Sequence, residues 1–217
     1  MDRRYALGVI GAAAVAGGAW ALTRRTDGVP GLAALADGSQ ADPAAITEMT
    51  MGPADAKVTL IEYASFTCPH CATFHNGPLK RIKEEYIKTG KIQFIYRDVY
   101  FDRPGLWAAL VARCDPSKFF GISDLLYGDP KSWIGTGEPT VIADNLRKVG
   151  RIAGLTDDQL ESCLADGAKA QSLYTWFQAN AEADKIDSTP SLVLNGEKHS
   201  NMSYEDLKKL LDEALEA

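Results

Sequence analysis

A pair of cysteines separated by two residues lies where a buried strand gives way to a helix, and this placement constrains the fold most. Residues 58–63 form a short β-branched and aromatic run, which is typical of a buried strand. The sequence Cys-Pro-His-Cys follows at residues 68–71, and a polar, helix-favouring stretch at 79–87 ends at Gly90. The cysteine pair is therefore expected at the start of a helix.

A second strand and a long helical segment come next. Residues 91–101 alternate between two faces, which predicts a strand and completes a βαβ unit. From 104 to 186 the apolar residues have helical spacing, and Thr156 with Gln159 forms a capping box. About 80 residues of helix are far more than one crossover between parallel strands needs. We therefore expect an inserted helical subdomain at 104–186.

The chain after the insert returns to sheet. Residues 191–194 form an apolar strand, an Asn-Gly pair predicts a tight turn into a short edge strand, and Ser203 caps a final helix. The expected architecture is α/β, in the order βαβ, helical insert, ββα. Its sheet domain would be formed by residues 52–103 and 187–217.

The first residues have the pattern of an export signal. Two arginines precede an uncharged apolar run that ends at Leu22 with small residues near its end. The run is also about long enough for an uncleaved inner-membrane anchor, and the paired arginines permit a twin-arginine route. We expect a signal or anchor at 1–23, a Gly-, Ala-, Pro- and Asp-rich linker at 24–51, and folded structure from near Ala56. The remaining chain would then be exported to the periplasm.

Composition excludes one class of binding partner. Lys and Arg total 23 against 29 Asp and Glu, a net charge of -6, so there is no basic surface for a nucleic acid. Four cysteines are too few for a disulfide-dense mini-protein. The function therefore depends on how these cysteines are used.

A metal site is the first alternative for the cysteine pair. Structural zinc usually has four ligands, often from two closely spaced pairs. The only other histidines are His75 and His199, and Cys114 and Cys163 lie singly in predicted helices. A three-ligand set with His70 or His75 can be drawn, but a second ligand pair is missing. We therefore expect no metal and no cofactor.

A redox pair fits the position better. Cys68 at the first turn of a helix faces unpaired backbone N–H groups and the positive end of the helix dipole, which favour the thiolate. Cys71 lies one turn further on and can bond back to it, while Pro69 is tolerated at a helix start. His70 adds a polar donor that is positively charged when protonated. A stable reduced form makes the disulfide a good oxidant, so the pair should donate disulfides.

Two more positions fit this chemistry. Glu62 lies six residues before Cys68 on a strand that is otherwise buried, and its carboxyl group could relay the proton of Cys71. The alternative for Glu62 is a solvated charge on an open face of the sheet. The Thr189-Pro190 pair directly precedes the returning strand, where a cis bond would leave the Thr189 backbone free to pair with an extended substrate.

The motif with its flanks resembles a known family. Residues 61–71, I-E-Y-A-S-F-T-C-P-H-C, are similar to the active-site stretch of the DsbA family of bacterial envelope disulfide oxidoreductases. The layout over about residues 52–215 is similar to the thioredoxin fold of that family. The resemblance implies that Cys68 is the nucleophile exchanged with substrates and that Cys71 resolves the mixed disulfide.

The resemblance also implies roles for further residues and partners. It implies that His70 stabilises the thiolate, that Glu62 helps proton transfer and that Pro190 is cis. The substrates would be unfolded or newly exported polypeptides that contain cysteine, and a membrane partner of the DsbB type would reoxidise the protein. We expect a monomer.

The second cysteine pair departs from the best-known members and is similar to that of some relatives in this family. Cys114 and Cys163 each lie on an apolar helical face, and in an oxidising compartment we expect an internal disulfide. Closing a loop of about 50 residues would stabilise the fold by about 4 kcal/mol in the chain-entropy model. Buried free thiols, or a regulatory pair that tunes Cys68, remain alternatives.

The sequence thus predicts an enzyme, a periplasmic thiol oxidase that donates the Cys68–Cys71 disulfide to exported proteins. Two alternatives stay open. One is a disulfide isomerase or reductase of the same fold, and the other is a metal-binding envelope module without turnover.

Overall fold

The computed structural model describes residues 41–217. The predicted signal or anchor at 1–23 and most of the predicted linker lie outside the described residues. Within residues 41–217, no helix is both long enough and apolar enough to cross a membrane.

A five-stranded mixed sheet runs through the molecule in the order β1-β3-β2-β4-β5. Strands β2 and β3 are parallel, and every other neighbouring pair is antiparallel. The strands are β1 (Met49–Met51), β2 (Val58–Ala64), β3 (Ile92–Asp98), β4 (Ser191–Leu194) and β5 (Glu197–Ser200). The α/β class and the order of strands, insert and terminal helix that the sequence predicts are confirmed.

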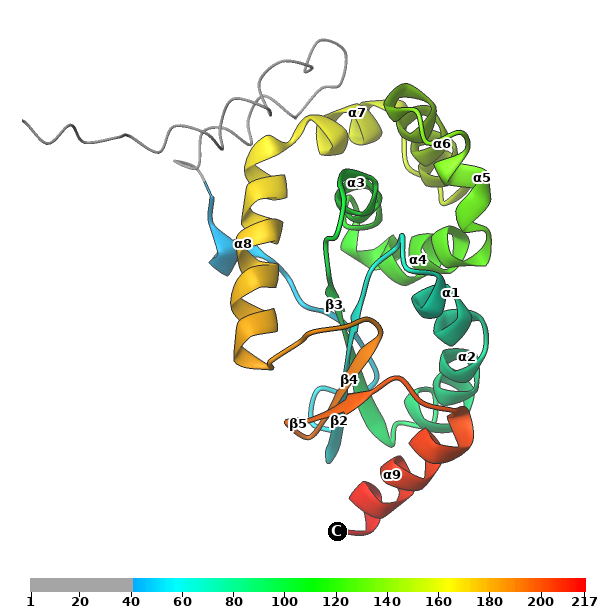
Figure 1. Cartoon of the computed structure of the whole chain (residues 1–217), viewed down its shortest axis with the longest axis vertical. Helices are drawn as coiled ribbons and strands as arrows, with labels where there is room; N and C mark the ends of the chain where they lie inside the picture. The colour runs from blue at the N-terminus through cyan, green and yellow to red at the C-terminus, as the bar shows by residue number, and fades with distance from the viewer. Residues whose placement is uncertain (1–40) are drawn as a thin grey trace, which may run out of the picture.

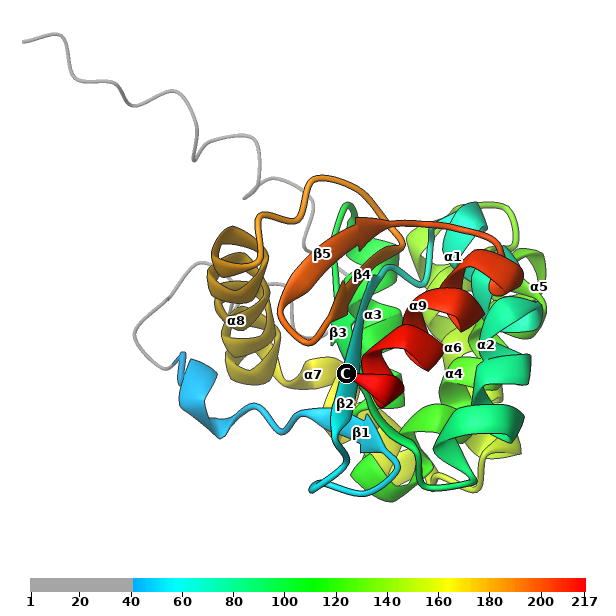
Figure 2. The ribbon, with the colours of Figure 1, turned by 90° about the horizontal axis from the view of Figure 1, so that it is seen from below.

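Helices cover both faces of this sheet. Helices α1, α2 and α9 pack on one face, and α8 lies along the other (Figures 1 and 2). Their bounds are α1 (Pro69–Asn76), α2 (Pro78–Ile82) continued by a π-helical turn η4 (Lys83–Ile87), α8 (Gly167–Ala183) and α9 (Tyr204–Glu216). Because both faces are covered, the central strand β2 is buried along most of its length.

The segment between β3 and β4 is helical, as its spacing predicts. It stands over the end of the sheet where β2 and β3 finish (Figure 1). Besides α8 it contains α3 (Arg103–Ala112), a 3-10 turn η5 (Pro116–Lys118), α4 (Phe119–Gly128), α5 (Pro130–Ile134), α6 (Pro139–Ile152) and α7 (Asp157–Ala165). A disulfide joins Cys114, just after α3, to Cys163 in α7, so these two helices are linked covalently.

Folded structure begins earlier than the sequence predicts. A 3-10 turn η3 (Pro43–Ala45) precedes β1, whose residues pair antiparallel with β3 in a part of the chain expected to be a linker. The backbone N–H of Asp42 also donates to Ser172 Oγ in α8, at 2.9 Å. With only three residues, β1 shows no sequence period, and backbone pairing with β3 holds it in place.

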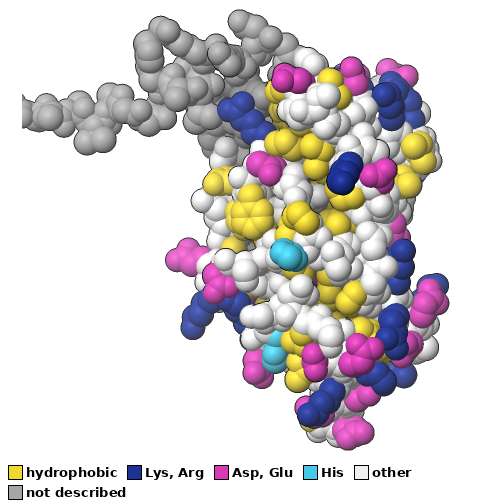
Figure 3. All heavy atoms as spheres, turned by 45° about the vertical axis from the view of Figure 1, so that its right-hand side comes forward, with side chains coloured by type: hydrophobic (Ala, Val, Ile, Leu, Met, Phe, Trp, Pro, Cys, Tyr) yellow, Lys and Arg dark blue, Asp and Glu magenta, His cyan; other side chains and the backbone are white. Residues whose placement is uncertain are grey.

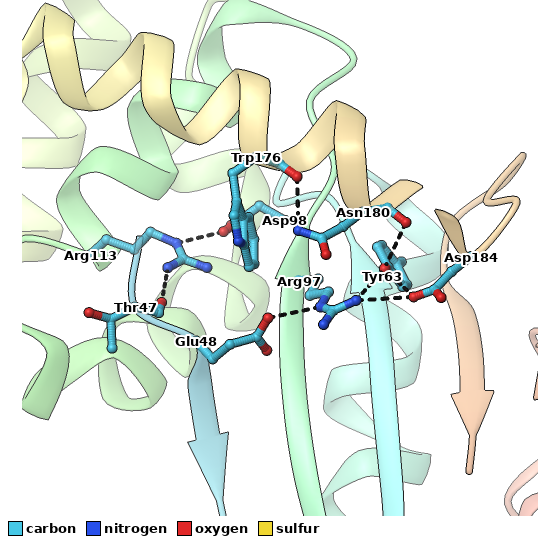
Figure 4. Close-up of polar contacts among 9 residues, drawn as sticks. All are labelled: Thr47, Glu48, Tyr63, Arg97, Asp98, Arg113, Trp176, Asn180 and Asp184. Atoms are coloured by element: carbon cyan, nitrogen blue, oxygen red, sulfur yellow. Dashed lines mark hydrogen bonds and ion pairs between the residues drawn. The ribbon is translucent and has the colours of Figure 1, made fainter. Parts of the chain in front are cut away.

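Arg97 connects β3 to the residue before β1 and to the end of α8 (Figure 4). From β3, its Nε donates to Glu48 Oε1 at 3.0 Å, and its Nη1 donates to the Tyr63 hydroxyl at 2.7 Å. Nη1 also lies 3.0 Å from Asp184 Oδ2, at the end of α8. One guanidinium thus connects three segments that are distant in sequence.

Arg113 makes a second, more deeply buried connection, next to Trp176 of α8 (Figure 4). Its Nε donates to Asp98 Oδ2 at 2.6 Å, and its Nη1 donates to the Thr47 carbonyl at 2.9 Å. Both charged side chains are 2% exposed. Both guanidinium groups lie near the Trp176 ring on α8, that of Arg113 at 5.4 Å from the ring centre and that of Arg97 at 5.9 Å. The arm before β2 is therefore part of the folded domain.

Candidate active site

Cys68 is the N-cap of α1, as its position in the motif predicts. The β2 strand ends at Ala64, and a turn closed by a hydrogen bond from Cys68 N to Ser65 O, 3.1 Å long, leads into the helix. Pro69 is the first helical residue, where its missing N–H leaves no bond unmade. The N–H of Cys71 donates to Cys68 Sγ at 3.4 Å, so a backbone donor faces the sulfur.

The two cysteines differ in their access to solvent. Both are free thiols here, and Cys68 is half-buried while Cys71 is fully buried. His70, between them, is exposed. An attacking sulfur from outside can therefore reach Cys68 and not Cys71.

The Thr189–Pro190 segment lies beside Cys68. Strand β4 runs antiparallel to β2 with Ser191 opposite Tyr63, so the residues that precede β4 meet the loop that follows β2. The Thr189–Pro190 peptide bond is cis, and the Thr189 carbonyl oxygen is 3.5 Å from Cys68 Sγ. The backbone next to the proposed nucleophile thus comes from a segment 121 residues away.

Glu62 is fully buried beneath α1, so the alternative of a solvated charge on an open face is wrong. Its Oε2 is 2.9 Å from Nε2 of His75, which is also buried. The His75 ring lies against the Tyr127 ring, with 3.9 Å between the ring centres. The structure therefore places a carboxyl–imidazole pair under the cysteine motif.

Sequence reasoning considered His75 only as a zinc ligand. Its spacing did carry a signal, because a residue four after Cys71 on a helix shares the face that Cys71 buries. Within residues 41–217, no group of three or more His, Cys, Asp or Glu side chains could hold a metal ion. The three-ligand set drawn from the sequence is not assembled, since His70 is exposed while His75 binds Glu62.

Burial raises the pKa of the Cys71 thiol well above its ordinary value, and the negative charge of Glu62 raises it further. A thiolate at Cys71 is therefore unfavourable. Whenever the Cys68–Cys71 disulfide opens, the Cys71 sulfur must take up a proton, and whenever the disulfide forms, the sulfur must lose one. A buried proton acceptor close to Cys71 is thus needed for exchange.

Comparisons with known proteins find relatives of this chain. A family model described as thioredoxin matches residues 44–213. A Rickettsia bellii protein that carries the name protein-disulfide oxidoreductase is 29% identical over 171 residues, which are 78% of this chain and 65% of that protein. A Bacillus cereus protein named for disulfide bond formation, protein D, is 27% identical over 183 residues, covering 78% of this chain and 79% of its own length.

Solved structures show the same fold. The crystal structure of Wolbachia pipientis alpha-DsbA1 matches with a TM-score of 0.70 at 24% identity, over 78% of this chain and 92% of that one. The chain spans a little under two thirds of the Rickettsia relative, at 65% of its length.

Proposed function

This chain belongs to the thioredoxin family, and we propose that it is a thiol:disulfide oxidoreductase that donates its Cys68–Cys71 disulfide to exported proteins. One observation carries the proposal. Cys68 is an accessible sulfur at a helix N-cap beside the Thr189 carbonyl, while its partner Cys71 is buried. The relatives named for disulfide exchange support the same reaction.

The reaction would proceed in two exchanges. A substrate thiolate attacks Cys68 Sγ, which breaks the Cys68–Cys71 bond and leaves a mixed disulfide, while the Cys71 sulfur takes up a proton by way of Glu62. A second substrate thiolate then attacks the substrate sulfur of the mixed disulfide and releases Cys68 as a thiolate. The substrate loses two electrons and the cysteine pair gains them.

The helix start favours this direction of transfer. The N–H of Cys71 donates to Cys68 Sγ, and the positive end of α1 faces the same sulfur. The protonated His70 side chain, between the cysteines, would add a positive charge. Each interaction stabilises the reduced form, and a stable reduced form makes the disulfide a stronger oxidant.

An extended polypeptide is the substrate that suits the surroundings of Cys68. The Thr189 backbone, before the cis Pro190, would pair with a substrate strand and hold its cysteine against Cys68 Sγ. The side of the molecule that carries α1 has a broad run of hydrophobic and uncharged surface through its middle (Figure 3). Such a surface fits unfolded chains, which expose apolar residues.

We place the reaction in the periplasm, with residues 1–23 as the export signal or an inner-membrane anchor. The disulfide between Cys114 and Cys163 is typical of an oxidising compartment and supports this location. A membrane protein of the DsbB type would accept the two electrons and restore the Cys68–Cys71 disulfide. The protein would act as a monomer.

Disulfide transfer to a peptide tests the proposed function. The oxidised protein is mixed, without oxygen, with an unstructured peptide that contains two cysteines, and peptide disulfide is measured by mass spectrometry. We expect one peptide disulfide for each Cys68–Cys71 disulfide consumed. If the protein reduces disulfides of insulin but leaves the dithiol peptide unoxidised, it is a reductase and the proposed direction is wrong.

A further inference from the structure

His75 is a buried histidine with no role in the exchange reaction described above. It lies one turn after Cys71 on α1, and its Nε2 is 2.9 Å from Oε2 of Glu62. We propose that His75 is a positioning residue, which holds the Glu62 carboxyl group by one oxygen so that the other oxygen exchanges a proton with Cys71. This inference rests on the proposed function and adds to it the residue that prepares the proton acceptor.

The two carboxyl oxygens of Glu62 differ in their hydrogen bonding. Oε2 is bonded to His75, whereas Oε1 is buried with no hydrogen-bond partner among the described residues. Nδ1 of His75 is likewise buried and unpartnered within residues 41–217. Buried carboxylate oxygens of Glu48 and Asp98 are unpaired too, but Oε1 of Glu62 is the one that belongs to a carboxyl group acting on the Cys71 thiol, so it is free to accept a proton there. We assign the Cys71 thiol as the group that exchanges this proton, because His75, which binds Glu62, lies one turn after Cys71 on α1 and the charge of Glu62 acts on that thiol.

The groups that face His75 leave Glu62 as the proton acceptor. Tyr127 from α4 stacks on the imidazole, and Tyr96 from β3 meets it edge-on with 5.8 Å between ring centres. The two hydroxyls bond to each other at 2.7 Å, and burial raises the pKa of both tyrosines well above the ordinary value. Both stay neutral and cannot serve as a base near neutral pH.

Other charges near this cluster are already paired. Asp98, whose charge also acts on both tyrosines, is bound through Oδ2 by the Arg113 guanidinium at 2.6 Å. Within residues 41–217, the hydrogen-bond partner of the Glu62 carboxyl group is Nε2 of His75. An imidazole N–H is therefore the donor that fixes the rotamer of this carboxylate.

The proton transfer matters when Cys71 attacks. In a mixed disulfide at Cys68, the Cys71 thiol gives its proton to Oε1 of Glu62, and its sulfur then attacks Cys68 Sγ. The Cys71–Cys68 bond forms, the bond from Cys68 to the outside thiol breaks, and that thiol leaves as a thiolate. Throughout, the Nε2–H of His75 donates to Oε2 and keeps the carboxylate in place.

Rapid mixing of the reduced full chain with oxidised glutathione isolates this step. Cys68 first forms a mixed disulfide, and Cys71 then expels the glutathione in a first-order reaction that acid quenching and mass spectrometry can follow. His75→Phe keeps the ring packed on Tyr127 but removes the donor. We expect it to slow the Cys71 step about tenfold, a part of the roughly hundredfold or more that a positioned proton acceptor contributes, because Glu62 is still present but no longer held. His75→Gln, whose amide N–H can still reach Glu62, should restore the rate to within about threefold of the wild type.

Two controls separate positioning from packing. The first step, attack by Cys68, should change less than about twofold in every variant, which shows that the site is folded. In a Glu62→Gln background, His75→Phe should cause less than about a twofold further loss, because the two residues act as one unit. This double variant buries no charge, so it remains informative if His75→Phe alone does not fold.

Three outcomes are decisive. Rescue by His75→Gln, with non-additivity in the Glu62→Gln background, supports the proposal. If His75→Gln is as slow as His75→Phe, or if His75→Phe slows the Glu62→Gln protein equally, His75 acts by packing and the proposal is wrong. A failure of the proposed function would instead appear in the wild type, as a lack of disulfide transfer to the dithiol peptide.

Discussion

Replacing Cys68 with alanine is expected to abolish disulfide transfer, whereas replacing Cys71 is expected to trap the reaction halfway. Cys68 is the sulfur that an outside thiol can reach, whereas Cys71, the other cysteine at the start of α1, is fully buried. Without Cys71, a mixed disulfide at Cys68 has no internal thiol to resolve it. The peptide oxidation assay should therefore read zero for Cys68→Ala.

The trapped species is the more informative result. Reduced Cys71→Ala protein incubated with an oxidised cysteine peptide should gain the mass of one peptide, and a reducing agent should remove it. The matched control is Cys114→Ser with Cys163→Ser, which removes the other pair and should leave transfer intact. If Cys71→Ala retained full turnover, the mechanism with two cysteines would be wrong.

Replacing Arg113 with alanine should lower the free energy of unfolding by about 3–5 kcal/mol, the cost of leaving one partner of a buried ion pair alone. Burial raises the pKa of Asp98, and the Arg113 guanidinium opposes that effect. Without Arg113, Asp98 keeps its desolvation cost and loses its bond. The Thr47 carbonyl also loses its donor, so the arm before β2 should loosen.

Urea denaturation of the oxidised protein measures this effect. Arg151→Ala is the control, since Arg151 and Asp157 form an ion pair in which both side chains are largely exposed. It should cost at most about 1 kcal/mol. A double change, Arg113→Met with Asp98→Leu, should recover part of the loss, because apolar side chains need no partner. Equal losses for Arg113→Ala and Arg151→Ala would contradict the role assigned to the buried pair.

The fold could be predicted as far as local patterns reach. Neighbouring residues are enough to show the apolar run of β2, the helix caps and the helical period of the insert. These patterns predict the α/β class with its inserted helices. Strand β1 was not predicted, because three residues are too few to show an alternation of apolar and polar side chains. It is held by backbone pairing with β3, which is distant in sequence. The predicted helix at 79–87 is in fact α2 followed by a π-helical turn.

The candidate site divides in the same way. The two cysteines share one helix start, so their spacing alone places them together. The contact between Cys68 and Thr189 depends on the antiparallel pairing of β2 with β4, which the proline position only suggests. The hydrogen-bond partner of Glu62 could not be predicted from the sequence, because it depends on which helix packs over the strand that carries Glu62. Here that helix brings His75.

The reduction potential of the Cys68–Cys71 pair tests the central claim most directly. It is measured by equilibrating the wild type, and the Cys114→Ser, Cys163→Ser variant, in glutathione redox buffers and counting free thiols at Cys68 and Cys71. A donor of disulfides should give a value nearer to about −120 mV, as in DsbA, than to about −270 mV, as in thioredoxin. A potential at or below about −270 mV would mean that the pair prefers to reduce its partners, and would contradict the proposed oxidase.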